Sequence, residues 1–313
     1  MAVIGVDIGG TKIASAVFDE NGKILMKDLA ALEERSGSDV GSLIKERIKV
    51  LQNYCYQNNL IIESIGACVP GISWRKTGKV WAPNIPGWED YPLKKEIEKL
   101  LGEQIPVTID SDRACYILGE AWIGAAKDVD DAIFLAVGTG IGAGIFSGGR
   151  VIRGANDIAG AIGWLALNKP YLEKYESCGN FEYYASGEGL IRAVKEFLQK
   201  EKIYNGILNR DSLKGKDIFT AYDEGDSVAK KVIDQAVEYW GMASANLVSL
   251  FNPEKIIFGG GVFGPGLKFL SEIKKEAEKW AQPIAIKQVE FLPSELKGDA
   301  GLYGAGYLAL RNK

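Results

Sequence analysis

The chain repeats one pattern, in which an apolar strand runs into a glycine turn and a second β-rich run follows. The first copy contains residues 7–11 (DIGGT), and the second contains residues 137–144 (VGTGIGAG). The similarity lies in the pattern and not in the residues themselves. It predicts two like domains that face each other across a central cleft, with a glycine turn from each domain at that cleft.

Short runs rich in β-forming residues alternate with longer helical patterns, which predicts an α/β protein. The expected strands cover residues 3–7, 13–18, 23–27, 64–69, 107–109, 131–136, 141–146, 255–258 and 287–291. The expected helices cover residues 40–57, 93–101, 113–124, 187–201, 226–250, 266–280 and 302–311. No stretch rich in proline or serine marks a flexible linker, so we expect the joint between domains near residues 119–128.

The sequence contains no histidine, which is the commonest general base and metal ligand. Acid–base work therefore falls to carboxylates, lysine, tyrosine or cysteine. The net charge of −4, with no run of Lys and Arg, argues against nucleic acid as a partner. The four cysteines are scattered without a CxxC pair, so neither a disulfide framework nor a cysteine zinc cage is expected.

The location of the protein is expected to be cytoplasmic, without a membrane partner. Residues 1–8 enter a strand at once, with no basic segment, apolar segment or cleavage site of a leader peptide. No apolar run approaches the roughly 18–20 residues that a membrane span needs.

Residues 2–12 (AVIGVDIGGTK) suit the binding of a polyphosphate. Gly9 and Gly10 allow backbone N–H groups to approach phosphate oxygens closely. Thr11 could donate a hydrogen bond, Lys12 could supply positive charge, and Asp7 could hold a hydrated Mg²⁺. The alternative is a hairpin turn that is merely rich in glycine, since a β-like run follows it.

Two later glycine groups also follow apolar strands. The turn at residues 138–144 could wrap a β- or γ-phosphate with its backbone amides. The group at residues 258–266, with five glycines, precedes a predicted helix and suits a nucleotide base or ribose lying against flat backbone. A tight strand-to-helix turn is the structural alternative for this last group, although such a turn needs fewer glycines.

Asp112 stands where a predicted strand ends and a helix begins, within residues 109–114 (IDSDRA). Because the chain has no histidine, a carboxylate is the natural group to accept a proton from an acceptor hydroxyl. The structural alternative is helix capping, since Asp110 or Ser111 is a good N-cap candidate at such a junction. The local sequence leaves both interpretations open.

The motifs coincide in order and spacing with those of a known family. They are residues 7–12 (DIGGTK), 69–71 (VPG), 82–88 (APNIPGW), 119–122 (GEAW), 138–144 (GTGIGAG), 153–156 (RGAN), 259–261 (GGG) and 299–301 (DAG). With them the chain resembles the ROK family (repressor, open reading frame, kinase) of glucokinase- and fructokinase-like sugar kinases over nearly its whole length. The resemblance implies an actin/hexokinase-like (ribonuclease H-like) α/β fold, with duplicated domains flanking a central cleft.

We expect a small domain of residues 1–118 plus 300–313, with the first phosphate loop and the catalytic aspartate. The large domain is expected at residues 119–299, with the second phosphate loop and the adenosine site. The resemblance implies an ATP-dependent kinase that uses Mg²⁺, has Asp112 as its catalytic base and forms a homodimer or homotetramer. The implied ATP- and phosphate-binding residues are Asp7 (to Mg²⁺ through water), Gly9, Gly10, Thr11, Lys12, Gly138, Thr139, Gly140, Gly259, Gly260 and Gly261. The acceptor-binding positions are Asn84, Ser111, Asp112, Ala161, Trp164 and Glu182.

The chain departs from the family pattern around the acceptor. The family shows Asn-Asp where this chain has Ser111-Asp112, and Gly-Glu-x-Gly-His where it has residues 160–164 (GAIGW). Ala161 therefore replaces a glutamate that grips the sugar, and Trp164 replaces a histidine that binds sugar and zinc. The cysteine-rich zinc loop is shortened to residues 177–182 (SCGNFE), in which Glu182 matches a sugar-contacting glutamate. Structural zinc needs about four ligands, so no zinc is expected here.

The acceptor is therefore expected to be a small sugar, cyclitol or other polyol rather than ordinary glucose, with hexoses, amino sugars and sugar acids as options. Trp164 could stack on a sugar ring or fill the space of the missing zinc site. Arg113 could meet an acidic acceptor, although the residue after Asp112 on a helix usually points elsewhere. The alternative function is an inactive or weakly active sugar-binding sensor. A repressor is disfavoured, because the family's repressors carry a DNA-binding domain before the first motif.

Overall fold

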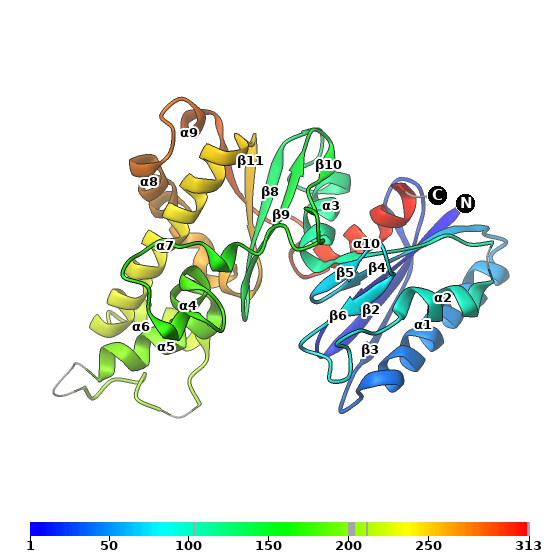
Figure 1. Cartoon of the computed structure of the whole chain (residues 1–313), viewed down its shortest axis with the longest axis horizontal. Helices are drawn as coiled ribbons and strands as arrows, with labels where there is room; N and C mark the ends of the chain where they lie inside the picture. The colour runs from blue at the N-terminus through cyan, green and yellow to red at the C-terminus, as the bar shows by residue number, and fades with distance from the viewer. Residues whose placement is uncertain (103, 200–203, 211, 312–313) are drawn as a thin grey trace.

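The computed structural model describes residues 1–102, 104–199, 204–210 and 212–311, which form two lobes joined at the middle of the molecule (Figure 1). The first lobe contains a five-stranded sheet in the order β3-β2-β1-β4-β7. Its strands are β1 (Ala2–Ile8), β2 (Lys12–Phe18), β3 (Ile24–Ala31), β4 (Ile62–Val69) and β7 (Val107–Ser111). The strands β1, β2 and β3 pair antiparallel, whereas β4 and β7 run parallel to β1.

The second lobe repeats this topology with a five-stranded sheet in the order β10-β9-β8-β11-β12. Its strands are β8 (Ala132–Val137), β9 (Ile141–Ser147), β10 (Arg150–Val151), β11 (Lys255–Gly259) and β12 (Glu290–Pro293). Again the first three strands pair antiparallel, and the last two run parallel to the first. The repeated strand–turn–strand pattern of the sequence therefore does correspond to two sheets of the same topology.

Helices α1 (Gly37–Gln57) and α2 (Leu93–Leu101) pack on the first sheet, and a small hairpin of β5 (Ile72–Trp74) and β6 (Lys79–Trp81) lies beside them. Between the two sheets lie α3 (Asp112–Ile123) and α10 (Ala300–Arg311), which pack against each other. The approach of α10 to the first sheet is very close, because a Cβ at Gly66 would lie 2.0 Å from the Ala305 carbonyl oxygen. Glycine is therefore required there.

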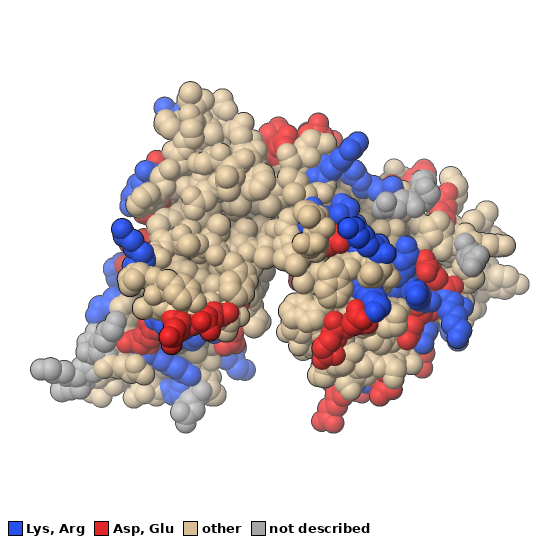
Figure 2. Space-filling model, in the orientation of Figure 1, with Lys and Arg blue, Asp and Glu red and all other residues tan. Residues whose placement is uncertain are grey.

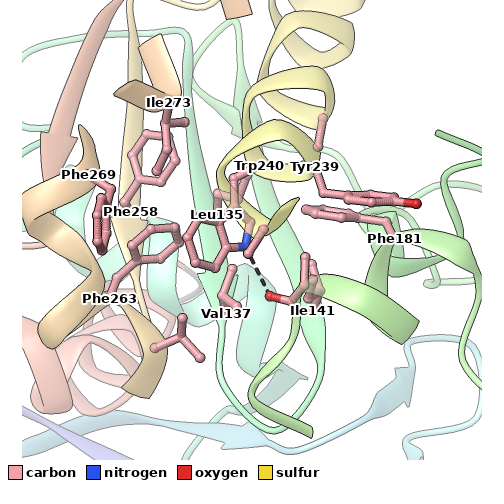
Figure 3. Close-up of a cluster of buried hydrophobic side chains, with 14 of the residues drawn as sticks. Leu135, Val137, Ile141, Phe181, Tyr239, Trp240, Phe258, Phe263, Phe269 and Ile273 are labelled. Carbon is pink, nitrogen blue, oxygen red and sulfur yellow. Dashed lines mark hydrogen bonds between the residues drawn. The ribbon is translucent and has the colours of Figure 1, made fainter. Parts of the chain in front are cut away.

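The remaining helices belong to the second lobe. They are α4 (Asn180–Ala185), α5 (Gly187–Leu198), α6 (Gly215–Asp223), α7 (Ser227–Phe251), α8 (Leu270–Trp280) and α9 (Ala285–Gln288). The short 3-10 turns are η1 (Ile162–Trp164), η2 (Glu173–Tyr175), η3 (Gly261–Phe263), η4 (Pro265–Phe269) and η5 (Lys297–Asp299). Figure 3 shows Trp240 of α7 packed beside Phe258 and Phe263, with its Nε1 donating a hydrogen bond of 3.0 Å to the Ala185 carbonyl oxygen.

The structure corrects several expected boundaries. The strand expected at residues 287–291 is wrong at its start, because α9 occupies residues 285–288 and β12 begins at Glu290. The helix expected from residue 266 begins as the 3-10 turn η4 and becomes α8 only at Leu270. The helix expected at 187–201 is α5, which ends at Leu198, and residues 200 and 201 lie outside the described part of the chain. The short helices α4 and α6 were not expected.

Among the described residues, none of the helices combines the length and the apolar character that would let it cross a membrane.

Candidate active site

A cavity of about 670 Å³ lies between the two lobes, and residues from both lobes line it. Figure 2 shows the molecular surface hollowed between the lobes. The lining residues are Gly9, Gly10, Pro70, Gly71, Ile72, Trp81, Pro83, Asn84, Asp112, Arg113, Tyr116, Ala136, Gly138, Thr139, Gly140, Ile141, Gly142, Ile158, Ala161, Trp164, Glu182, Gly260 and Gly261. Most of the site residues predicted from the sequence are therefore brought together in one place.

The two glycine turns face this cavity from opposite lobes. In the first turn the Gly9 N–H donates to the Lys12 carbonyl oxygen, and in the second the Gly138 N–H donates to the Gly140 carbonyl oxygen, both at 2.9 Å. A Cβ at Gly140 would lie 2.8 Å from Oε2 of Glu182, so a side chain here would displace that carboxylate from its hydrogen bond with the Ile141 N–H. Tight turns of this kind leave neighbouring backbone N–H groups free to bind an anion.

Thr11 and Lys12 are exposed and do not line the cavity. Lys12 nevertheless acts on Asp7 through its charge. Burial raises the pKa of Asp7, whereas a hydrogen bond with Cys68 and the positive charge of Lys12 lower it. Asp7 lines a neighbouring cavity of about 520 Å³, together with Gly259, Gly260 and Gly261.

The third glycine group connects the central cavity to a side cavity. Gly260 has φ 92°, and a Cβ there would lie 2.4 Å from the Val137 carbonyl oxygen, so only glycine fits. Gly261 lines both the central cavity and a side cavity of about 500 Å³, as do Gly138 and Thr139. The side cavity is also lined by Lys214 and Lys216. The shared residues form a path from the side cavity to the two glycine turns.

Asp112 is the first residue of α3 and lies at the end of β7, as the sequence indicated. Its Oδ1 accepts a hydrogen bond of 2.8 Å from the Arg113 N–H. Burial raises the pKa of Asp112 to about 6, while the charge of Arg113 lowers it and the nearby Asp7 carboxylate raises it. A carboxyl group with this pKa is ionised at neutral pH and is well suited to act as a general base.

Ser111 caps α3 and does not line the cavity. Its Oγ accepts a hydrogen bond of 3.4 Å from the Ala114 N–H, which is the usual N-cap arrangement. Asp110, the other cap candidate, pairs with Arg153 at 2.6 Å. The structure thus confirms the capping role for Ser111, and the role of Asp112 as a base stays a prediction.

The other expected acceptor positions do line the cavity. They are Asn84, Ala161, Trp164 and Glu182. Glu182 lies in the first turn of α4, and its Oε2 accepts a hydrogen bond of 2.6 Å from the Ile141 N–H. Burial raises the pKa of Glu182, opposed by that hydrogen bond and by the charge of Arg192. The Trp164 side chain is 58% exposed, which leaves its ring available to a bound molecule.

A lysine surrounded by tyrosines lies close to Cys178, in the segment that leads into α4. Lys174 Nζ lies 4.7 Å from the ring centre of Tyr183 and 5.0 Å from that of Tyr184, and pairs with Glu196 at 2.6 Å. We call Lys174, Tyr175, Tyr183, Tyr184 and Glu196 the Lys174 cluster. The sequence interpretation overlooked it, although the density of tyrosines at residues 171–184 was a signal. No group of three or more His, Cys, Asp and Glu side chains in the described ranges is arranged to hold a metal ion.

Comparisons with known proteins show the family and the fold of the chain. The ROK family model matches residues 3–312 of the chain. The glucokinase of Halalkalibacterium halodurans is 34% identical, with 97% of this chain and 94% of that protein covered. A ROK hexokinase from Thermus thermophilus has a TM-score of 0.82 at 29% identity, covering 99% of this chain and 98% of that one. A ROK family glucokinase from Streptomyces griseus, solved with glucose and AMPPNP, has a TM-score of 0.77 at 32% identity over 100% of both chains. The predicted actin/hexokinase-like fold is thereby confirmed.

Proposed function

Because this chain belongs to the ROK family and is a carbohydrate kinase, we propose a role for each of its site residues in phosphoryl transfer. The γ-phosphoryl group of ATP passes to a hydroxyl of a small polyhydroxylated acceptor, and Asp112 takes the hydroxyl proton. One observation supports this above all others. Asp112 and the two glycine turns, which come from different lobes, line the same cavity.

ATP is proposed to lie along the path from the side cavity to the glycine turns. The nucleoside occupies the side cavity beside Gly261 and Lys216, and the triphosphate reaches the turns at Gly9 and Gly138. Backbone N–H groups of these turns bind the phosphate oxygens and hold the γ-phosphorus in line with the acceptor. The arrangement uses positioning and electrostatics, which supply most of the catalysis in phosphoryl transfer.

Mg²⁺ is proposed to bind near Asp7. The ion usually binds through one or two carboxylates, several waters and the substrate's phosphates, and the single Asp7 carboxylate beside the first glycine turn fits that donor set. When bound, the ion would neutralise charge on the transferring phosphate.

Asp112 performs the proton transfer. It is ionised above a pH of about 6, and it sits at the N-terminus of α3, where the helix dipole stabilises negative charge. A hydroxyl within hydrogen-bond reach of the carboxylate gives up its proton as its oxygen attacks the γ-phosphorus. The attacking oxygen and the leaving ADP oxygen then lie on opposite sides of the phosphorus.

The acceptor is proposed to be a compound other than ordinary glucose. Asn84 and Glu182 line the cavity and remain able to bind hydroxyls. Ala161 offers only a methyl group, and Ser111 is occupied as a helix cap. Trp164 presents an exposed ring, which can stack on the C–H face of a sugar.

The test is release of ADP from MgATP in the presence of a panel of hexoses, amino sugars, cyclitols and sugar acids. At least one acceptor is expected to stimulate ADP release, and Asp112→Asn is expected to lower that rate about 10²- to 10⁴-fold. Asp234→Asn is the matched control, because Asp234 is exposed on α7 and pairs only with Lys230 among the contacts described. If acceptors bind but none stimulates ADP release, the protein is a sugar-binding sensor and the proposal is wrong.

A further inference from the structure

Arg113 reaches into the central cavity directly beside Asp112. Its stem crosses Gly142 of β9, where a Cβ would lie 2.8 Å from the Arg113 Cδ. Its Nη2 donates a hydrogen bond of 3.4 Å to the Gly71 carbonyl oxygen, which belongs to the first lobe. The side chain therefore extends from the start of α3 to the Gly71 carbonyl of the first lobe, and Arg113 is one of the residues that line the cavity.

Arg113 also lies near residues 160–161, which include the proposed acceptor position Ala161. A Cβ built on Gly142 would lie close to the Arg113 stem and 3.7 Å from the Gly160 carbonyl oxygen. Gly160 immediately precedes Ala161, whose small side chain lines the same cavity. The Arg113 stem therefore lies near the segment that leads to Ala161, one of the proposed acceptor positions.

The charge of Arg113 acts on the Asp112 carboxylate, whose pKa it lowers, but no carboxylate of the described residues forms an ion pair with Arg113. Within the part of the chain that the structure describes, the charged residues lining the cavity are Asp112, Arg113 and Glu182. Arg113 makes no ion pair within 4 Å there, whereas Arg153 pairs with Asp110 and Arg75 with Asp157 near the same cleft. A half-buried guanidinium that has one long bond to a carbonyl oxygen keeps most of its five donors free.

We infer that Arg113 binds a carboxylate group of the acceptor, so that the substrate is a sugar acid. This inference rests on the proposed kinase function and names its substrate class. A guanidinium pairs with a carboxylate through two parallel hydrogen bonds, a geometry that a neutral hydroxyl does not offer. A phosphate dianion fits less well, because Asp112 and Glu182 add two negative charges to the same cavity.

The experiment uses the full-length protein and pairs of acceptors that differ only in one carboxylate. Suitable pairs are glucuronate with glucose, galacturonate with galactose, and gluconate with sorbitol, with glucose 6-phosphate as a phosphorylated probe. ADP release is measured at pH 8, where Asp112 stays ionised even if its pKa rises in a variant. The wild type is expected to prefer the carboxylate member of at least one pair.

The variant Arg113→Gln tests the residue itself. It is expected to lower kcat/KM for the carboxylate acceptor about 10- to 100-fold, which is the usual effect of losing a charged hydrogen-bond pair. The kcat/KM for the neutral partner is expected to stay nearly unchanged. Arg113→Lys should keep part of the preference for the carboxylate acceptor. The control is Arg35→Gln, which changes an exposed arginine paired with Glu33 and should keep the whole preference.

Three outcomes overturn the inference. The first is a wild type that prefers neutral or phosphorylated acceptors. The second is an Arg113→Gln variant whose kcat/KM falls equally for every acceptor and whose pH profile shifts on its acid side. That result would show that Arg113 acts only on Asp112. The third is an Arg113→Gln variant that still prefers the carboxylate acceptor over its neutral partner as strongly as the wild type does.

Failure of the kinase proposal gives a different result. If no acceptor stimulates ADP release, acceptor binding is measured by calorimetry in the wild type and in Arg113→Gln. Binding of a sugar acid that is lost in the variant supports the inference and rejects the kinase function. Turnover of neutral sugars alone supports the kinase function and rejects the inference.

Discussion

Nε and Nη2 of Arg153 both lie 2.6 Å from Oδ2 of Asp110. This ion pair joins the end of β7 in the first lobe to the segment after β10 in the second lobe. Burial raises the pKa of Asp110, and the positive charge of Arg153 lowers it again. The contact therefore fixes the two lobes relative to each other within two residues of Asp112.

Removal of Arg153 is expected to destabilise the protein strongly. Arg153→Gln leaves the buried Asp110 carboxylate without its cation, and the loss of one partner of a buried pair costs about 3–5 kcal/mol. The free energy of unfolding is measured by urea denaturation. The double variant Arg153→Gln/Asp110→Asn, which leaves no charge unpaired, is expected to recover part of the loss. Equal stability of the single variant and the wild type would contradict this account.

The activity of the enzyme is expected to fall in acid with an apparent pKa of about 6, which is the value for Asp112. Below that pH the carboxyl group is protonated and cannot accept a proton, and above it the ionised form dominates. The profile of kcat/KM against pH should therefore rise through pH 6 and level off above it. The residual activity of Asp112→Asn should lack this limb, whereas Asp234→Asn should keep it; an unchanged limb in Asp112→Asn would exclude Asp112 as the base.

A methyl group at Gly138 is expected to weaken ATP binding without weakening the fold. No atom of the described chain lies within 4 Å of an added Cβ at Gly138, so the methyl group would enter the cavity that the phosphates are proposed to occupy. Gly138→Ala should raise the KM for ATP about 10-fold or more, a change of about 1.4 kcal/mol, at unchanged melting temperature. Gly140→Ala is the contrasting variant, since its methyl group meets Glu182 and should lower the melting temperature even without ATP. An unchanged KM in Gly138→Ala would place the phosphates elsewhere.

The Lys174 cluster is expected to stabilise the segment that carries Glu182. Lys174→Met removes a cation that contacts two tyrosine rings and the Glu196 carboxylate, and should cost about 1–2 kcal/mol. Thermal unfolding measures the change, with Lys195→Met on the exposed side of α5 as the control. A zinc chelator is expected to leave the melting temperature of the wild type unchanged. A large fall with chelator would show that a metal, not Lys174, holds the segment.

The duplicated topology could be predicted from the sequence because its signals are local. Each glycine turn lies between two apolar runs, and the two runs pair as a hairpin in both copies, with Ile8 opposite Ile13 and Val137 opposite Ile141. The strand-to-helix junction at Asp112 is equally local. Both features depend on residues that are close together along the chain.

The direction of Arg113 could not be predicted, because it depends on residues far from it in sequence. The rule that neighbouring helix positions face different ways disfavoured a shared site, yet Asp112 and Arg113 both line the cavity at the first turn of α3. Space for the side chain comes from Gly142 on β9, and its hydrogen-bond acceptor is the Gly71 carbonyl oxygen. Likewise, α9 was mistaken for the start of a strand because its four residues carry no periodic signal of their own.

The packing of α10 against β1 and β4 has a consequence for synthesis on the ribosome. Leu302 and Ala309 cover Val3, Ala14 and Phe18, and Ser64 donates a hydrogen bond of 2.8 Å to the Ala309 carbonyl oxygen. The partners of this contact are separated by more than two hundred residues of chain, including the whole second sheet. A nascent chain must therefore carry an uncovered apolar face on its earliest strands until residues 300–311 have emerged.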